Sequence, residues 1–141
     1  MFTVSVIHNF ETAHRLPFLG GKCTNLHGHS WLAEVELHGV PDPNGIIADF
    51  GALKKIVRSW IDENWDHGAI LGREDPLWPI LKETSSKVYV FEGIRPWPTV
   101  ESVAWELATV LQGHPDMPDN VSVYQVEITE TAVNKATWRR R

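Results

Sequence analysis

The first forty residues contain two stretches in which apolar and polar side chains alternate. In residues 2–12, one face carries Phe2, Val4, Val6, His8 and Phe10. Residues 28–39 repeat the alternation, with Trp31, Ala33, Val35 and Leu37 on one side. A period of two is typical of a β-strand with one covered face. A loop is expected between the two strands, because residues 13–26 hold Pro17 and two adjacent glycines.

Two later segments carry apolar side chains at helical spacing. The first is expected to run from Phe50 to Trp65, with Asp49 as its N-cap. The second is expected to begin near Thr99, which follows Pro98 and is a second N-cap candidate. Its apolar stripe consists of Val100, Val103, Ala104, Leu107, Ala108 and Leu111. Both segments are therefore predicted to be amphipathic helices.

The remaining segments differ in how clearly they indicate structure. Residues 66–98 contain four prolines and no steady period, so an irregular connection with one strand, Val88–Glu92, is expected there. Residues 121–130 indicate a strand, and 133–139 a further one. The predicted order is strand, strand, helix, short strand, helix, strand, strand, within a single domain of residues 1–141.

Composition narrows the classes of function. The chain has 141 residues, is 43% hydrophobic and 22% charged, and has a net charge of −5, which fits an ordinary globular protein. Its only basic run is Arg139–Arg141, so nucleic acid is not an expected partner. No apolar run approaches membrane-spanning length, so no membrane is expected either. Residues 1–15 contain no apolar targeting core, and Cys23 is the only cysteine. We therefore expect a cytoplasmic protein whose lone thiol has no internal disulfide partner.

Three histidines and the single cysteine lie close together in the sequence. Cys23 precedes His27 by four residues, and His27 and His29 are two apart, so both rings would share one face of a strand. His14, at the end of the preceding strand, can supply a third nitrogen by antiparallel pairing. Three imidazoles with an open position are typical of a catalytic zinc site. Spacing alone leaves open that these are unrelated surface or core histidines.

Three further residues have both a chemical and a structural interpretation. Cys23 is either a small buried side chain or a thiolate favoured by Lys22 and a metal. Asp66 beside His67 suits proton transfer, although a histidine after a helix can simply interact with the helix dipole. Glu130 can accept two hydrogen bonds from a flat amidine-like edge, or it is an ordinary glutamate at a strand end.

Several motifs together resemble a known family. They are Phe10-x-x-Ala13-His14-Arg15-Leu16, Cys23-x-x-Leu26-His27-Gly28-His29-Ser30, Gly45-x-x-x-Asp49-Phe50, Asp66-His67, Pro98-Thr99-x-Glu101 and Glu130-Thr131. In this order they resemble the 6-pyruvoyl-tetrahydropterin and 6-carboxytetrahydropterin synthase family across residues 2–131. Leu-His-Gly-His-Ser and Asp-Phe-Gly are closer to the 6-carboxytetrahydropterin branch.

The resemblance implies an α+β tunnelling fold. Each subunit would form a four-stranded antiparallel sheet with two helices on one face. Three subunits would close a barrel, and two trimers would stack into a homohexamer with active sites at subunit interfaces. Barrel closure would remove the exposed sheet edges of a single subunit.

The resemblance also implies a reaction and roles for the residues. His14, His27 and His29 would bind Zn²⁺, and Cys23 would act as the base. His67, oriented by Asp66, would relay protons, while Glu130 would hold the pterin and join the relay. Thr99 and Glu101 would contact the substrate, and Lys22, Arg15 and Lys54 are candidate cations for its triphosphate.

The implied activity is that of a zinc-dependent lyase. The 6-carboxytetrahydropterin branch converts 7,8-dihydroneopterin triphosphate to 6-carboxy-5,6,7,8-tetrahydropterin, acetaldehyde and triphosphate, in queuosine or other deazapurine biosynthesis. The alternative is the pyruvoyl branch, which eliminates only triphosphate. A non-catalytic pterin or metal-binding module and a small zinc hydrolase are more remote, because the first needs no thiolate and the second lacks HExxH spacing.

Two features depart from the family pattern. Trp31 stands where the family usually has Phe or Tyr, a change expected to affect packing. The connection 68–97 is long compared with the shorter members of the family and carries Trp78 and Trp97, so it is expected to reshape the pocket mouth.

Overall fold

A long antiparallel hairpin forms the centre of the molecule. In the computed structural model, which describes residues 1–141, β1 (Phe2–His14) pairs with β2 (His27–Gly39). The register is continuous from Phe2 opposite Gly39 to His14 opposite His27. The predicted alternation is confirmed over most of both strands, because side chains on one face are mostly buried or half-buried and those on the other are mostly exposed. Phe2, at the start of β1, is an exception and is exposed.

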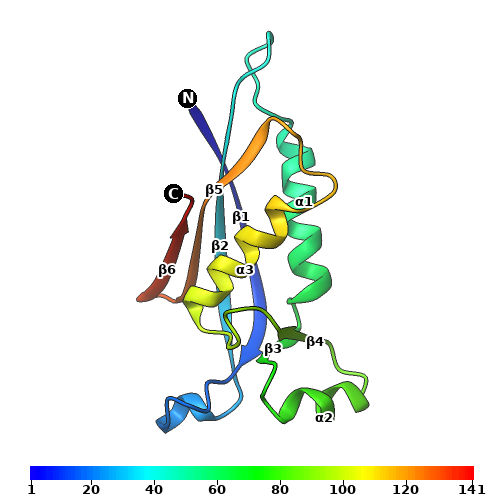
Figure 1. Ribbon diagram of the computed structural model, residues 1–141, viewed down its shortest axis with the longest axis vertical. Coiled ribbons are helices and arrows are strands. Elements are labelled where there is room, and N and C mark those ends of the chain that lie inside the picture. Colours follow the sequence, from blue (N-terminus) through cyan, green and yellow to red (C-terminus); the bar gives the residue numbers. More distant parts are fainter.

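Four further strands extend this hairpin into a mixed sheet of order β4-β3-β1-β2-β5-β6 (Figure 1). On one side, β5 (Val121–Thr131) and β6 (Asn134–Arg139) continue the antiparallel pattern. On the other side, β3 (Gly68–Gly72) runs parallel to the end of β1, and β4 (Val88–Phe91) runs parallel to β3. The four strands predicted from alternation therefore form one contiguous antiparallel block.

Two helices cover the buried face of the sheet (Figure 1). Helix α1 (Phe50–Asn64) begins after Asp49, whose carboxylate accepts a 2.8 Å hydrogen bond from the Ala52 amide. Helix α3 (Val100–Gln112) begins after Thr99, whose hydroxyl oxygen accepts from the Ser102 amide at 3.1 Å. Both predicted caps are confirmed. None of the helices has the length and apolar character that a membrane crossing requires.

The core lies between these helices and the sheet. Its largest fully buried side chains include Trp31 of β2 and Phe10 of β1, which stack with ring centroids 6.0 Å apart. Trp65, directly after α1, packs on Phe10 at 5.6 Å. This aromatic layer anchors the end of the hairpin at which the histidines lie.

The predicted architecture of four antiparallel strands with two helices is incomplete. The structure has six strands in a mixed sheet, and a third helix, α2 (Leu77–Glu83). The sequence Gly-Ala-Ile-Leu-Gly of β3 has no alternation, because four of its five residues are buried on both sides of the strand. Helix α2 holds Pro79 in its first turn, where proline is tolerated but weakens the sequence signal. The strand expected at Val88–Glu92 is confirmed.

Removal of side-chain volume from the helix–sheet layer should destabilise the fold. Ile61 in α1 is 0% exposed, whereas Ile94 is 83% exposed. Ile61→Ala is expected to lower the free energy of unfolding by about 2–5 kcal/mol, because it leaves a cavity in the core. The matched control Ile94→Ala should change it by less than about 0.5 kcal/mol. Urea unfolding followed by tryptophan fluorescence measures both, and equal losses in the two variants would contradict this packing.

Candidate metal centre and active site

The three predicted ligand histidines meet at one end of the hairpin. His14 lies directly opposite His27 in the β1–β2 ladder, and His29 lies opposite Thr12. All three rings project from the face that the helices cover. One potential ligand atom from each lies within 4.8 Å of the other two. The antiparallel pairing expected from the sequence is thus the arrangement that brings them together.

Backbone carbonyls orient two of the three rings. His14 Nδ1 lies 2.9 Å from the carbonyl oxygen of Pro98, and His27 Nδ1 lies 2.7 Å from that of Asn25. With a proton on Nδ1, each ring keeps its Nε2 lone pair free for a metal. Trp31 packs edge-on against His14 and His29, with centroids 4.9 and 5.4 Å away. The rings are therefore held by hydrogen bonds and by packing.

Burial favours the neutral, metal-binding form of these rings. It lowers the pKa of His14 to about 4, with a further contribution from the neighbouring His27 and His29. Burial also lowers the pKa of His29, against the opposing effect of Glu130. At neutral pH both imidazoles are therefore uncharged and have a lone pair to donate.

The donor set fits a transition metal such as zinc. His29 Nε2 is buried and has no hydrogen-bond partner within the protein. A buried polar atom without a partner is costly, and a metal ion would satisfy it. Three imidazole nitrogens beside an open cavity match the ligands of a catalytic zinc site, although they also suit neighbouring ions of the series.

A cavity of about 720 Å³ joins the histidines to most of the other predicted site residues. Cys23, Glu130, Thr99 and Glu101 all line it together with the histidines. Thr99 also caps α3 through its hydroxyl, so its side chain is already partly engaged. Residues far apart in the sequence therefore converge on one space in a single chain.

Glu130 lies close to two of the histidine nitrogens. Its two carboxylate oxygens are 3.7 Å from His14 Nε2 and 3.8 Å from His29 Nε2, beyond hydrogen-bond distance. The side chain is 20% exposed and comes from the end of β5. A carboxylate in this position can accept hydrogen bonds from a ligand that enters the cavity.

The loop that carries Cys23 is fixed at several points. The Leu16 amide donates to the Cys23 carbonyl oxygen at 2.8 Å, and Cys23 lies in the short 3-10 turn Gly21–Thr24. Phe18 packs on Trp97 with ring centroids 5.6 Å apart. Cys23 is half-buried and lines the cavity.

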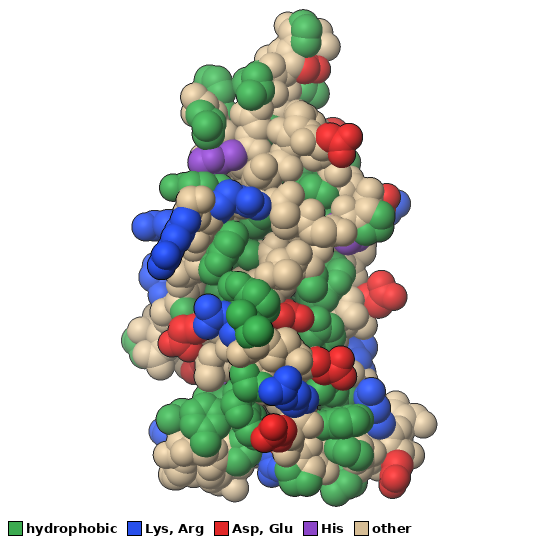
Figure 2. Space-filling model, viewed as in Figure 1, with side chains coloured by type: hydrophobic (Ala, Val, Ile, Leu, Met, Phe, Trp, Pro, Cys, Tyr) green, Lys and Arg blue, Asp and Glu red, His purple; other side chains and the backbone are tan.

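Sequence reasoning missed the apolar wall of the cavity. Leu16, Phe18, Leu19 and Val100 line it, and Phe18 and Leu19 are more than half exposed. The run Pro-Phe-Leu-Gly-Gly looks like an ordinary loop, and only the folded chain places its apolar side chains beside the metal ligands. Figure 2 shows hydrophobic side chains gathered at the lower end of the molecule, where this loop lies.

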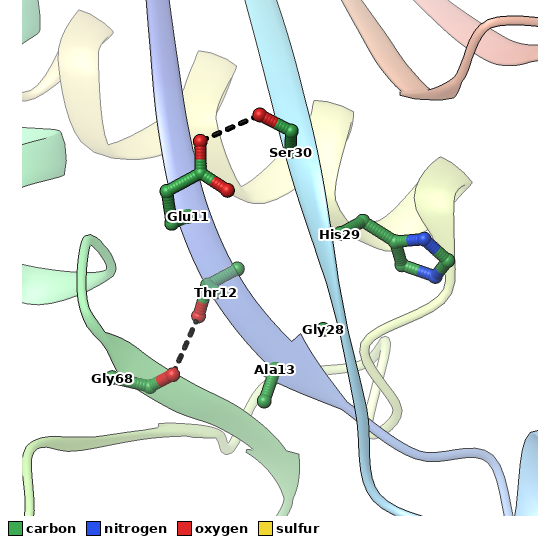
Figure 3. A pocket seen from close by; sticks show the side chains of 7 residues that line it. All are labelled: Glu11, Thr12, Ala13, Gly28, His29, Ser30 and Gly68. Carbon is green, nitrogen blue, oxygen red and sulfur yellow. Dashed lines mark hydrogen bonds between the residues drawn. The ribbon is translucent and has the colours of Figure 1, made fainter.

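Asp66 and His67 do not line this cavity in the same chain. His67 Nδ1 lies 2.7 Å from one carboxylate oxygen of Asp66. The other oxygen of this carboxylate accepts a 2.8 Å hydrogen bond from the Glu11 amide. The His67 side chain is 78% exposed. The pair lies beside a shallow hollow of about 360 Å³ whose lining includes Glu11, Ser30 and Gly68 (Figure 3). The ring of His29, at the edge of this hollow, points away from Glu11 and Ser30.

The candidate cations for a triphosphate also separate in space. Lys22 lines the cavity, but Arg15 and Lys54 do not. Arg15 forms two hydrogen bonds with the buried carboxylate of Asp75, with Nε at 2.8 Å. The contact with Arg15 and the hydrogen bond from Leu77 outweigh burial and lower the pKa of Asp75, so this is a stable ion pair. Arg15 therefore ties the end of β1 to the segment before α2.

Solved structures with the same fold support this architecture. A structure of an uncharacterized protein from Wolinella succinogenes superposes with a TM-score of 0.75 at 23% identity, covering 99% of this chain and 98% of that one. The 6-pyruvoyl tetrahydropterin synthase of Caenorhabditis elegans superposes with a TM-score of 0.74 at 27% identity, covering 99% and 96%.

Sequence relatives extend the similarity. A 6-carboxy-5,6,7,8-tetrahydropterin synthase from Rickettsia felis is 31% identical over 125 residues, covering 86% of this chain and 88% of the relative. The enzyme of that name from Haemophilus influenzae is 31% identical over 139 residues, covering 93% and 94%. The sequence profile of the 6-pyruvoyl tetrahydropterin synthase family matches residues 3–141. The chain therefore belongs to the 6-pyruvoyl tetrahydropterin synthase family.

Proposed function

We propose that this protein is a zinc-dependent lyase that converts 7,8-dihydroneopterin triphosphate to 6-carboxy-5,6,7,8-tetrahydropterin, acetaldehyde and triphosphate. The observation that carries the proposal is the placement of Cys23 in the same cavity as His14, His27 and His29. Several relatives that span most of this chain have the name of this enzyme. The product would serve queuosine or other deazapurine biosynthesis.

The three histidines would hold the zinc ion through their free ring nitrogens. When bound, the ion supplies Lewis acidity that lowers the pKa of substrate hydroxyl groups and stabilises negative charge on oxygen. The carbonyl oxygens of Pro98 and Asn25 keep the rings of His14 and His27 in the binding orientation. The apolar side of the cavity would limit the access of water to the site.

The protein groups around this centre would divide the remaining chemistry. Cys23, as the thiolate, would take a proton from the side chain of the pterin. Glu130 would accept hydrogen bonds from the 2-amino group and N3–H of the ring and join the proton relay. Lys22 would face the triphosphate, and Thr99 and Glu101 would contact the substrate. His67, whose Nδ1 is hydrogen-bonded to the Asp66 carboxylate, would exchange protons with the substrate through Nε2.

Free sheet edges favour a homo-oligomer, which we propose to be a hexamer of two stacked trimers. β3 pairs with β1 only at Thr12 and Ala13, so most of the outer edge of β1 has no strand beside it. β6 is an edge strand at the other end of the sheet. Pairing of these edges between subunits would close a barrel. In such an assembly, Asp66 and His67 of one subunit can complete the cavity of another.

Product analysis separates the two branches of the family. Incubation of the zinc-loaded protein with 7,8-dihydroneopterin triphosphate should release acetaldehyde, because the carboxy branch loses the outer side-chain carbons. Mass spectrometry of the pterin and an aldehyde trap measure the two products. A pyruvoyl product without aldehyde would establish the alternative, 6-pyruvoyl-tetrahydropterin synthase.

Loss of the thiol should separate catalysis from metal binding. Cys23→Ala is expected to keep the fold and the zinc but to lower kcat by about 10²–10⁴-fold, the usual contribution of a positioned general base. Circular dichroism and zinc analysis check the fold and the metal. Full activity in this variant would exclude Cys23 as the base.

Removal of one ligand should release the metal and abolish turnover together. His29→Ala leaves two imidazoles, which hold zinc far more weakly than three. The control is His38→Ala, because His38 stacks on Tyr124 and does not line the cavity. Wild type should retain zinc to a lower pH than a site of exposed histidines would, because burial lowers the pKa values of His14 and His29 and so weakens the competition from protons. Equal zinc contents in both variants would argue against the histidine site.

Mixed oligomers test whether the active site is shared. Homo-oligomers of Cys23→Ala and of His67→Ala should each be inactive. When the two variants are co-expressed in equal amounts and mix at random, about a quarter of the shared sites should contain both an intact Cys23 and an intact His67, so about a quarter of wild-type activity should return. The regained activity requires that Cys23 and His67 act from different subunits. Size-exclusion chromatography with light scattering should give the mass of a hexamer. Inactive mixtures would show that each chain uses its own pair.

A further inference from the structure

The backbone of His67 adopts a conformation that needs support. Its φ angle is 58°, in the left-handed region of backbone conformation that residues other than glycine rarely adopt. Such a conformation persists only where neighbouring contacts enforce it, and it is frequent at functional sites. Contacts around the Asp66–His67 pair must therefore hold this conformation in place.

The peptide unit between Asp66 and His67 is held at both of its polar ends. The His67 amide donates to the carbonyl oxygen of Glu11 at 2.6 Å. The Asp66 carbonyl oxygen accepts a 2.7 Å hydrogen bond from the ammonium group of Lys87. Because the two contacts fix the plane of this peptide, they also limit the direction in which the His67 ring can point.

Lys87 makes a second contact that fixes its own position. Its ammonium group also donates to the carbonyl oxygen of Asp62 in the last turn of α1, at 2.8 Å. Carbonyls at a helix C-terminus lack helical partners and carry partial negative charge, so a cation is favoured there. Lys87 therefore bridges the end of α1 and the peptide that precedes His67.

The stem of Lys87 is also in close contact with the chain. A Cβ atom at Gly68 would lie 3.0 Å from the Cγ and Cδ atoms of Lys87 and 2.9 Å from its carbonyl oxygen. That carbonyl accepts from the Ala69 amide at 3.0 Å. Figure 3 shows Gly68 beside β1, where its carbonyl accepts from the Thr12 hydroxyl. Glycine at 68 thus leaves room for the lysine to lie across the turn.

We propose that Lys87 is a positioning residue for the Asp66–His67 pair, acting through the peptide bond that joins them. The inference rests on the proposed function only in assigning this pair a role in the reaction. Lys87 neither lines the cavity nor belongs to the histidine cluster, and its contact with the pair is the hydrogen bond to the peptide that precedes His67.

The surrounding charges are consistent with this role. Burial raises the pKa of the Asp66 carboxyl, but the Glu11 amide, His67 and the charge of Lys87 outweigh it and lower the pKa below its usual value. Asp66 is therefore a carboxylate over the working pH range and can accept from His67 Nδ1. The nearby carboxylate of Asp62 is engaged with His8 at 2.7 Å.

Lys87→Met tests the inference, because methionine keeps an apolar stem over Gly68 but cannot donate a hydrogen bond. In the zinc-loaded full-length oligomer, kcat should fall about 10–100-fold with KM changed less than about 3-fold, the usual cost of losing a supporting contact. The pH profile of kcat should shift as well. Lys87→Arg retains a charged donor and should recover most of the activity.

Hydrogen exchange followed by mass spectrometry gives a readout independent of activity. The peptide containing His67 should exchange about 10–100-fold faster in Lys87→Met, because a charged hydrogen bond that holds the turn is lost. The control is Lys55→Met, since Lys55 is an exposed residue of α1 outside every contact described above. It should leave exchange, kcat and zinc content unchanged.

The outcomes separate this inference from the proposed function. If wild type does not act on the pterin triphosphate, the proposed function fails, while the exchange measurement still decides whether Lys87 holds the peptide. Unchanged exchange in Lys87→Met overturns the inference whatever the activity. Faster exchange with a wild-type kcat and pH profile in an active enzyme also overturns it, because the contact would then not serve the reaction.

Discussion

The backbone ladder between β1 and β2 is the constraint on which the site depends. Its register places His14 opposite His27, so that two distant parts of the sequence present nitrogens to one point. A shift of one residue would turn every side chain of a strand to the opposite face. The same ladder puts Phe10 and Trp31 in the core, so burial of the aromatic layer and convergence of the ligands require the same pairing.

The sequence predicted this part of the molecule well, because it depends on local periodicity. The alternation in residues 2–12 and 28–39 predicted both the strands and the common face of His27 and His29. Asp49 and Thr99 lie directly before regular apolar stripes, and both cap their helices. These features arise from short-range rules that a single sequence displays.

The parts that were missed depend on contacts between distant residues. Nothing in the sequence pairs Arg15 with Asp75, and Arg15 therefore looked like a free cation. β3 is too short and too uniformly apolar for its direction to be read, and it pairs in parallel only after the chain has crossed over. The sequence does not distinguish Lys87 from the other lysines, because its two partners, the carbonyl oxygens of Asp62 and Asp66, meet its ammonium group only in the folded chain.

Gly72, at the end of β3, packs against the segment that leads to the metal centre. A Cβ atom at this position would lie 2.5 Å from the Pro96 carbonyl oxygen and 2.5 Å from the ring of Trp97. The same short segment continues to Pro98, whose carbonyl orients His14. Even a methyl group at position 72 would collide with this segment, which would have to shift. The absence of a side chain at position 72 thus lets the segment 96–98 pack closely against β3, and the orientation of His14 depends indirectly on a residue outside the cavity.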